Sequence, residues 1–332
     1  MIHFVRAAFG LEEKTPVELS PLEGRGSDRS FFRATWNLTD TAILIHYDPK
    51  RTENAYYADI GLFLKEMGLP VPKVYGHDPD LSLVVMEDLG ETDLFSFRNA
   101  PWEVRRRLYR KTLSVASKLH RLTEKDLPRG GLKLMEGFDL DLYRWEQNYF
   151  KTHFVKNLCG IELGMADEEK IEGEFLNLAL SLLRTKPCLI HRDLQSQNVM
   201  VRDGEPYLID FQGMRFGSPF YDLASLLCDP YVGFEEGERM ELLEHYYSLF
   251  DPNLSRNEFE KIFWEASAQR LMQALGAYGY LGLEKGLRRF LSYVPAGLKN
   301  LMLALGHLEG FPNLTQLAYR CRERIETKGW HR

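Results

Sequence analysis

The most informative segment of the chain is a polar loop between two short apolar runs. Asp193 and Asn198 lie five positions apart in this loop, and the next apolar run ends at Asp210. A carboxylate can accept the proton of an attacking hydroxyl, and a carboxamide and a second carboxylate offer the oxygen ligands that Mg²⁺ prefers. Phosphoryl transfer requires this set, so the segment predicts Asp193 as the catalytic base and Asn198 and Asp210 as metal ligands.

Other polar residues of the loop each have two interpretations. We expect His191 to pack and hydrogen-bond beneath the loop, and Arg192 either to brace the loop or to contact a phosphate. Gln195 and Gln197 either bond the hydroxyls of a substrate or are ordinary polar loop residues. Taken alone, each residue fits a simple loop, but their joint spacing between two apolar strands favours the catalytic interpretation.

The elements that must position this loop change in character along the chain. Residues 1–90 are rich in strand-like runs and contain one predicted helix, at residues 54–67. Residues 102–183 and those after Ser218 have helical periodicity, and short strands are predicted between 187 and 211.

We therefore predict the α+β class, with a bilobal fold laid out like a protein kinase. A small antiparallel β lobe with one helix spans residues 1–90 and ends in a hinge, and a large, mainly helical lobe spans residues 91–332. Ligands usually bind in the cleft between two lobes. We expect the first lobe to bind the nucleotide and the second to carry the catalytic and substrate residues.

Composition argues against several other classes of protein. The 332 residues are 44% hydrophobic, which is enough for a large core, and the net charge of -6 argues against a general nucleic-acid binder. The four cysteines are scattered, and no stretch has the length of a membrane span or the apolar core of a signal peptide. We expect a cytoplasmic protein that binds neither nucleic acid nor membrane.

The run from His191 to Asn198 has the spacing of the protein-kinase signature, but Gln212 stands where kinases have glycine after Asp-Phe. Together with the run at residues 217–224, this pattern resembles the aminoglycoside-phosphotransferase and choline-kinase-like families. The resemblance implies ATP and Mg²⁺ as cofactors and a small molecule with a hydroxyl group as acceptor. It also implies that Asp222 braces the catalytic loop.

The same resemblance assigns a nucleotide-binding side to the chain. A glycine-bearing turn can present backbone N–H groups to phosphate oxygens, and the resemblance implies this role for Gly24, Gly26 and Ser27. In these families the adenine pairs with the backbone of the hinge, which implies Glu87 and Leu89 here.

The third strand departs from these families at one position. Where a lysine or arginine is expected to face the phosphates, the chain has Ile45 or His46. The candidates for a substitute cation are His46, Lys50, Arg51, Arg25 and Arg29. Its carboxylate partner on the following helix is either Asp59 or Glu53.

Bacterial kinases that phosphorylate the anomeric hydroxyl of N-acetylmuramate or N-acetylglucosamine are similar to this chain over most of its length, and they also lack that lysine. The shared features are Ser30–Arg33, the hinge Met86–Gly90, the aromatic helix Trp145–Phe150 and the late helix Gln269–Gly276. The chain departs from them at residues 194–197 and 282–286.

This resemblance implies a sugar kinase of a cell-wall recycling route. Glu146, on the aromatic helix, either lines the sugar site or is a solvated residue of an amphipathic helix, and Arg215 is a candidate for binding a substrate carboxylate. Two alternatives stay open: a kinase for an aminoglycoside or another amino alcohol, and a kinase-like fold that binds nucleotide without catalysis.

Overall fold

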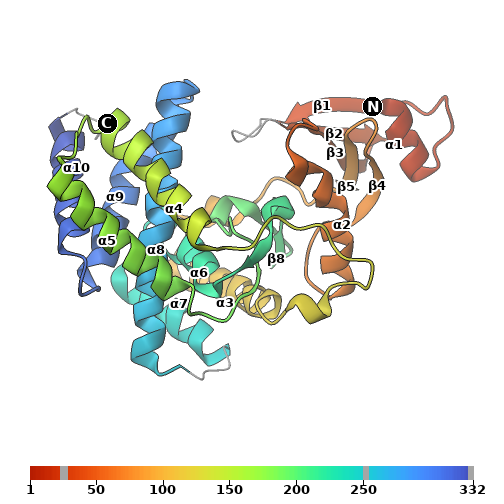
Figure 1. The fold of residues 1–332 in the computed structure, drawn as a ribbon. Coiled ribbons are helices and arrows are strands. Elements are labelled where there is room, and N and C mark those ends of the chain that lie inside the picture. The colour runs from red at the N-terminus through yellow and green to blue at the C-terminus, as the bar shows by residue number, and fades with distance from the viewer. Residues whose placement is uncertain (23–28, 250–253, 328–332) are drawn as a thin grey trace. The chain divides into compact units, whose positions relative to one another are not determined.

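The structure is a computed structural model that describes residues 1–22, 29–249 and 254–327. The chain divides into two compact units. The first unit comprises residues 1–96, 125–135 and 197–214, and the second comprises residues 97–124, 136–196 and 215–332. Mixed helices and antiparallel strands confirm the α+β class (Figure 1).

Among its described residues, the first unit contains a five-stranded antiparallel sheet, a separate hairpin and two α-helices. Its elements are α1 (Ile2–Phe9), β1 (Glu18–Leu22), β2 (Ser30–Trp36), β3 (Asp40–His46), α2 (Thr52–Glu66), β4 (Val74–Asp78), β5 (Leu83–Glu87), β7 (Val199–Arg202) and β8 (Glu205–Leu208).

The main sheet has five strands in the order β1-β2-β3-β5-β4, and all neighbours are antiparallel. Alternate residues of the central strands point to one face, where Ala42 and Leu44 of β3 pack with Val85 of β5. Val5 of α1 is buried in the same cluster. The residues that alternate with them in β3 and β5 are buried as well, so both faces of these central strands are covered.

Helix α2 lies within two residues of its predicted bounds, whereas α1 was not expected. The residue pattern of positions 1–90 predicts a single helix. The eight residues of α1 are few for a periodicity signal, and the helix ends at Gly10, which adopts the left-handed conformation with φ of 62°. Burial of Val5 against the sheet stabilises this short helix.

A separate hairpin, β7-β8, carries the second half of the predicted catalytic segment. Its turn residues Asp203 and Gly204 have φ of 54° and 73°, as a type I′ turn requires. Backbone bonds from Val201 to Thr92 and from Leu208 to Pro70 attach the hairpin to the rest of the first unit. The predicted turn at these positions is therefore confirmed.

The second unit is mainly helical. Its elements are α3 (Trp102–Leu119), α4 (Leu140–Tyr149), α5 (Met165–Leu182), β6 (Cys188–Ile190), β9 (Arg215–Gly217), α6 (Pro219–Leu227), α7 (Glu236–Leu249), α8 (Arg256–Gly279), α9 (Val294–Gly306) and α10 (Pro312–Thr327). Strands β6 and β9 form an antiparallel pair.

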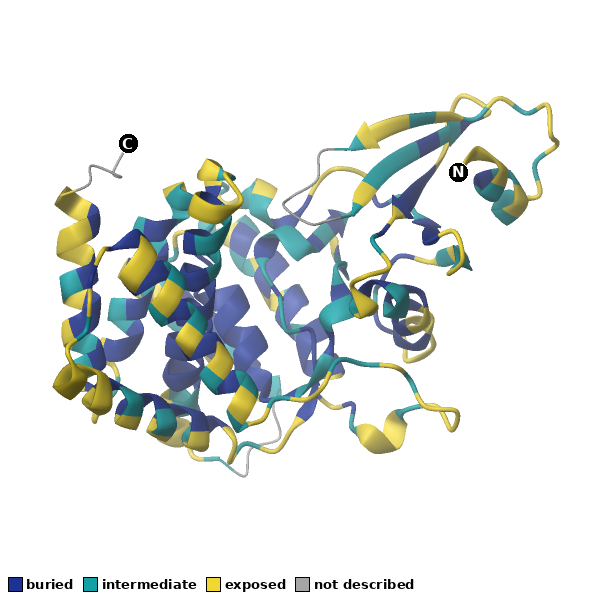
Figure 2. Cartoon of the chain, turned by 45° about the horizontal axis from the view of Figure 1, so that its top comes forward, coloured by how far each residue is buried: buried dark blue, intermediate teal, exposed yellow. Residues whose placement is uncertain are grey.

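Helix α8 is the longest described helix of this unit, and nearly all of its residues after Phe263 are buried (Figure 2). A long, fully apolar helix would normally occupy such a place, but α8 also buries Gln269, Arg270 and Gln273. Buried polar side chains require hydrogen-bond partners, so these residues point to an organised polar cluster inside the unit.

Two glycines let α8 approach α4 and its π-helical continuation, Phe150–Leu158. A Cβ atom on Gly276 would lie 3.1 Å from the backbone N of Phe150, and one on Gly279 would overlap the carbonyl oxygen of His153. Backbone atoms cannot move aside as the end of a flexible side chain can. The contact between these helices therefore depends on the absence of side chains at both positions.

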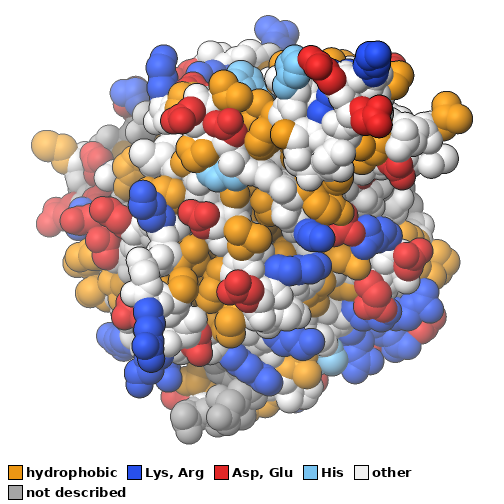
Figure 3. Space-filling view, turned by 90° about the vertical axis from the view of Figure 1, so that its right-hand side faces the viewer, with side chains coloured by type: hydrophobic (Ala, Val, Ile, Leu, Met, Phe, Trp, Pro, Cys, Tyr) orange, Lys and Arg blue, Asp and Glu red, His pale blue; other side chains and the backbone are white. Residues whose placement is uncertain are grey.

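No helix in the three described ranges combines the length and the apolarity needed to cross a bilayer. On the face of the molecule shown in Figure 3, lysine and arginine side chains are interspersed with aspartate and glutamate. This mixture agrees with the near balance of 42 basic and 48 acidic residues in the sequence.

We expect Gly279→Ala to lower the free energy of unfolding by on the order of 3 kcal/mol, because the added methyl group overpacks a backbone contact. Gly173→Ala is a matched control, since Gly173 lies on α5 with open space around its Cα. This control should be neutral or stabilising by about 0.5–1 kcal/mol. Denaturant unfolding of both variants measures the difference, and equal stabilities would contradict the packing argument.

Candidate active site

The start of the predicted catalytic loop is held by a buried carboxylate. Asp222 lies in the first turn of α6, a helix that begins with Pro219 at its first position. Its Oδ2 accepts the backbone N–H of His191 at 2.7 Å, and its Oδ1 accepts the backbone N–H of Arg192 at 2.8 Å. His120 Nε2 donates a third bond at 3.0 Å, since a carboxylate can only accept.

The end of the loop is held by a second buried carboxylate, which the sequence analysis did not identify. Asp229 follows the C-terminus of α6, and its Oδ2 accepts both the backbone N–H and the hydroxyl of Ser196, at 2.9 and 2.6 Å. The backbone N–H of Tyr231 donates to Oδ1 at 2.9 Å. Two aspartates at opposite ends of one short helix thus fix the loop on both sides of Asp193.

Asp193 forms an ion pair with an arginine that lies 77 positions later in the chain. Arg270 of α8 donates from Nη2 to Asp193 Oδ1 at 2.7 Å. The arginine is only 5% exposed, and its Nε donates to Ser225 Oγ at 2.8 Å. Because a second hydrogen bond fixes the guanidinium, Arg270 sets the orientation of the Asp193 carboxylate.

Asn198 and Asp210 lie side by side in the first unit. The carbonyl of Asn198 accepts the backbone N–H of Ile209 at 3.0 Å, at the open end of the β7-β8 hairpin. Asp210 has a φ of 63° and accepts a bond from Gln212 Nε2 at 3.1 Å. Carboxylate and carboxamide oxygens are thus brought to the end of one hairpin.

Arg29 forms an ion pair with Asp210, and only 8% of its side chain is exposed. The guanidinium also lies 5.4 Å from the centre of the Phe31 ring. The other candidates for the missing cation are more exposed: His46, Lys50 and Arg51 are exposed residues. Arg25, Gly24, Gly26 and Ser27 lie outside the described residues.

Neither predicted carboxylate of α2 pairs with strand β3. Glu53 lies 3.9 Å from Arg51, and Asp59 is exposed. Tyr57 of the same helix is instead buried, and its ring stacks on Phe211 with centroids 4.4 Å apart. Burial raises the pKa of Tyr57 well above its usual value, so the hydroxyl stays protonated. An aromatic stack next to Asp210 therefore connects α2 to the β7-β8 segment.

The predicted hinge is fixed by ion pairs from two arginines. Arg33 Nε donates to Asp88 Oδ2 at 2.7 Å, and Arg202 donates to Glu87 Oε1 at 2.7 Å. Burial raises the pKa of Glu87, but the bonds from the Lys73 backbone and from Arg202 outweigh it and lower the pKa overall. Leu89 is buried beside them. These contacts hold the hinge backbone in place.

Glu146 is a buried residue, 1% exposed, and not a solvated residue of an amphipathic helix. Its two oxygens accept bonds from the Tyr221 hydroxyl at 2.7 Å and from Gln269 Nε2 at 3.1 Å. On the exposed side of the same helix, the Trp145 and Tyr149 rings stack with centroids 5.2 Å apart. Contact between Glu146 and a sugar stays a prediction.

The remaining predicted substrate residues are partly buried. Arg215 lies in β9, and its guanidinium is 5.5 Å from the centre of the Phe138 ring. Gln195 belongs to the second unit and Gln197 to the first. The predicted catalytic set divides in the same way, with Asp193 in the second unit and Asn198 and Asp210 in the first. Their convergence on one substrate stays a prediction.

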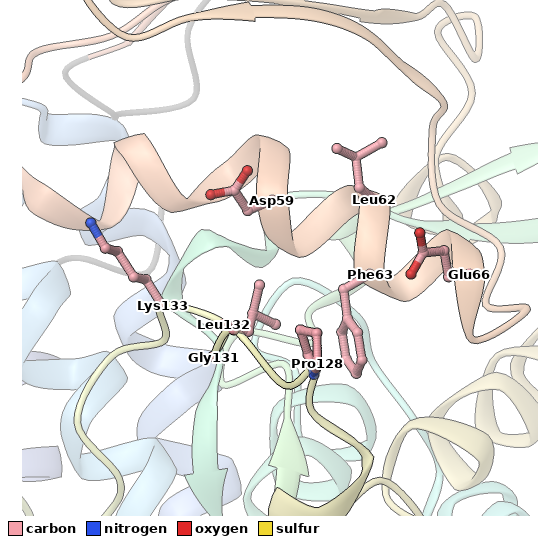
Figure 4. Close-up of a pocket in the computed structure, with 9 residues that line it drawn as sticks. Asp59, Leu62, Phe63, Glu66, Pro128, Gly131, Leu132 and Lys133 are labelled. Atoms are coloured by element: carbon pink, nitrogen blue, oxygen red, sulfur yellow. The ribbon is translucent and has the colours of Figure 1, made fainter.

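A pocket of about 410 Å³ lies in the first unit between α2 and the loop at residues 128–133 (Figure 4). Asp59, Leu62 and Phe63 line it from the helix, and Leu132 and Lys133 line it from the loop. The predicted catalytic residues do not line this pocket. Asp59 therefore faces a different environment from the one that the sequence analysis expected.

The donor set at Asn198 and Asp210 fits a metal that is bound mainly by other ligands. Among the described residues, no group of three or more His, Cys, Asp or Glu side chains could enclose an ion. Mg²⁺ commonly takes one or two protein oxygens and completes its shell with phosphates and water. The residues present are therefore compatible with Mg²⁺ that arrives together with a nucleotide.

Burial raises the pKa of Asp229 to about 6, although the bonds from Ser196 and Tyr231 lower it. An unfolded aspartate ionises near pH ~3.9. Between these values the unfolded chain loses a proton that the folded chain keeps, so the contribution of Asp229 to stability falls as the pH rises from about 4 to about 6. Above pH 6 this contribution is constant.

We expect the titration of Asp229 to lower the free energy of unfolding by on the order of 3 kcal/mol between pH of about 4 and about 6. The variant Asp229→Asn has no carboxyl group at this position and should not show this decrease. The measurement is the free energy of unfolding of wild type and Asp229→Asn in denaturant at several values of pH between 4 and 7.5. Titrations shared by both proteins cancel in the difference. Parallel curves across this range would contradict the assignment.

The fold agrees with comparisons with known proteins. The model of the phosphotransferase enzyme family matches residues 18–256. The chain is 26% identical over 279 residues to an N-acetylmuramate/N-acetylglucosamine kinase of Neisseria meningitidis, covering 82% of this chain and 81% of that protein. A kinase of the same name from Pseudomonas aeruginosa is 22% identical over 329 residues, covering 93% and 90%.

Two solved structures have a similar fold. A choline/ethanolamine kinase family protein from Mesorhizobium loti superposes with a TM-score of 0.61 at 16% identity, covering 97% of this chain and 99% of that one. The ADP-bound aminoglycoside phosphotransferase APH(2'')-Ib superposes with a TM-score of 0.60 at 15% identity, covering 90% and 98%. The chain belongs to the phosphotransferase enzyme family, and it is a kinase-type phosphotransferase that acts on a hydroxyl group.

Proposed function

We propose that this protein is an ATP- and Mg²⁺-dependent kinase that phosphorylates the anomeric hydroxyl of an N-acetylated amino sugar, N-acetylmuramate or N-acetylglucosamine, in the cytoplasm. The route that it serves is the recycling of cell-wall sugars. The observation that carries this choice of substrate is the similarity, over most of both chains, to kinases named for these two sugars.

Asp193 is the proposed general base, which accepts the proton of the sugar hydroxyl. Its carboxylate is oriented by Arg270, and the loop that bears it is fixed by Asp222 and Asp229. A base held in one orientation favours the geometry that in-line attack requires. A protein that only bound nucleotide would have no need for this support of a proton acceptor.

Asn198 and Asp210 are the proposed ligands of Mg²⁺, which neutralises charge on the phosphates when it is bound. The adenine is proposed to bond the backbone at Glu87 and Leu89, a segment that Arg33 and Arg202 hold in place. Gly24, Gly26 and Ser27 are proposed to cover the phosphates.

Arg29 is the proposed substitute for the cation that strand β3 lacks. It is the most buried of the candidates in the described residues, and its guanidinium already lies at Asp210. An arginine is suited to phosphate because its N–H groups match pairs of phosphate oxygens. His46, at the exposed end of β3, is the less favoured candidate.

Tyr149 and Trp145 are proposed to form the platform for the sugar ring. Their rings stack on each other, and Tyr280 lies 6.0 Å from Tyr149 between ring centres. Aromatic faces commonly bind the apolar face of a pyranose, because the ring C–H groups present a flat apolar surface. Gln195 and Gln197 are proposed to bond the sugar hydroxyls, and Glu146 is proposed to line the same site.

We expect Asp193→Asn to lower kcat for phosphorylation of N-acetylglucosamine by about 10²–10⁴-fold, because the asparagine cannot accept the proton. KM for ATP should change little. The matched control is Asp203→Asn in the β7-β8 turn, an exposed aspartate whose left-handed conformation asparagine also tolerates. The assay is the mass of the phosphorylated product.

A panel of acceptors with ATP and Mg²⁺ separates the alternatives. Turnover of an aminoglycoside or a choline-like alcohol, but of neither sugar, would refute the choice of substrate and keep the kinase. Equal background activity in wild type and Asp193→Asn with every acceptor would favour a protein that binds nucleotide without catalysis.

We expect Arg29→Met to raise KM for ATP or lower kcat, so that kcat/KM for ATP falls by about 10²-fold, as the loss of a charged contact to phosphate predicts. His46→Gln, Lys50→Met and Arg51→Met are tested beside it, since each removes one competing candidate. A loss confined to one of these three variants would overturn the assignment to Arg29.

A further inference from the structure

Gln273 of α8 is a buried glutamine that lies about one turn after the arginine bonded to Asp193. Only 9% of the residue is exposed. Its Oε1 accepts a bond from Nη1 of Arg270, and Nη2 of the same arginine bonds the carboxylate of Asp193 at 2.7 Å. Two consecutive hydrogen bonds therefore connect Gln273 to the proposed catalytic base, and all three residues belong to the second unit.

The bond from Arg270 fixes the direction in which the carboxamide of Gln273 points. An arginine side chain can only donate hydrogen bonds, so the carbonyl oxygen of the carboxamide must face the guanidinium. The NH₂ group of Gln273 must then face away from Arg270. Because the oxygen is already used, the part of this side chain that a ligand can bond is a hydrogen-bond donor.

The NH₂ group of Gln273 is open to a ligand. Across residues 1–22, 29–249 and 254–327 its Nε2 donates to no other residue, yet it is not one of the unpartnered polar atoms that are sealed from solvent. Gln269, one turn earlier, is fully buried, and its Nε2 donates to Glu146 at 3.1 Å while its Oε1 accepts from Gln147 at 2.9 Å. The core thus uses both ends of Gln269, whereas Gln273 keeps a donor available.

Gln273 lies between the proposed base and the proposed aromatic platform. Tyr280 follows it by seven residues, or about two turns, on the same side of the helix. The ring of Tyr149 packs against α8 between them, since a Cβ atom on Gly276 would lie 2.8 Å from Cδ1 of this tyrosine. A sugar held on these rings with its reacting hydroxyl at Asp193 would therefore pass Gln273.

We infer that Gln273 donates a hydrogen bond from Nε2 to the carbonyl oxygen of the acetamido group on the acceptor sugar. This inference rests on the proposed function. The acetamido group is carried by C2, next to the anomeric carbon that bears the reacting hydroxyl, so it lies close to the base. Its carbonyl oxygen accepts hydrogen bonds, which matches the one kind of bond that Gln273 can still make. The site thereby selects an N-acetylated sugar over the same sugar with a hydroxyl on C2.

The test compares kcat/KM for N-acetylglucosamine and glucose, which differ only by the group on C2, in wild type and Gln273→Met. We expect the variant to lose about 10-fold toward N-acetylglucosamine, while glucose stays within about threefold. The loss should appear mainly in KM, because the contact is remote from the transferred phosphoryl group. Where turnover of glucose is too slow to measure, its Ki as a competitor of N-acetylglucosamine gives the same comparison.

Gln273→Glu separates contact with the sugar from support of Arg270. The glutamate keeps an oxygen for the arginine, but its ionised carboxylate cannot donate a hydrogen bond. We therefore expect the same selective loss as in Gln273→Met, and an equal loss toward N-acetylmuramate, which carries the same acetamido group. Gln316→Met removes an exposed glutamine of α10 and should leave all three sugars unaffected. Thermal unfolding checks that each variant is folded.

The outcomes also separate this inference from the proposed function. An equal loss toward N-acetylglucosamine and glucose would overturn the inference, since it would show that Gln273 only supports Arg270 and Asp193, while the sugar kinase would stand. Full activity of Gln273→Glu toward N-acetylglucosamine would overturn the inference as well. A wild type that phosphorylates neither N-acetylated sugar would overturn the proposed function, and the inference with it.

Discussion

The geometry of the candidate site depends on two buried aspartates at the two ends of α6. Asp222 accepts the backbone N–H groups at the start of the catalytic loop, and Asp229 accepts the groups of Ser196 at its end. Ionised carboxylates that accept backbone N–H groups make strong hydrogen bonds in a buried environment. The six loop residues from His191 to Ser196 are thus bonded at both ends, to an aspartate in the first turn of α6 and to one just after its C-terminus.

The same helix organises the side chains around the loop. Ser225 of α6 bonds Arg270, and Tyr221 of α6 bonds Glu146, so α4, α6 and α8 are connected by polar contacts inside an otherwise apolar core. Such networks are costly to bury unless every member has a partner. Glu146 and Arg270 both have such partners on neighbouring helices of the second unit.

Local patterns made much of the fold predictable. The strands of the small sheet, helix α2 and the β7-β8 turn follow from alternation, helical spacing and turn residues over a few positions. The candidate catalytic segment could be predicted from the sequence for the same reason, because its residues are close together in the chain. Helix α1 was missed, since eight residues give too short a stretch for the periodicity to stand out.

The contacts that could not be predicted join residues that lie far apart in the sequence. In the sequence, Arg270 is one of several polar residues in a long predicted helix. Its bond to Asp193 could not be predicted because the two residues lie 77 positions apart. Asp229 resembles an ordinary residue after a helix until its bonds to Ser196 are seen. Arg29 was one of five candidate cations, and only the fold distinguishes it by bringing it to Asp210.

Gly276 and Gly279 of α8 contact the end of α4 and its π-helical continuation. This contact restricts which substitutions the protein can accept at the two glycines. The backbones of the two helices are in direct contact at these glycines. Any larger residue at either position would therefore force the helices apart. The frame behind Glu146 and Tyr149 is therefore constant. A change of acceptor in this protein would therefore have to come from side chains and loops rather than from the spacing of these two helices.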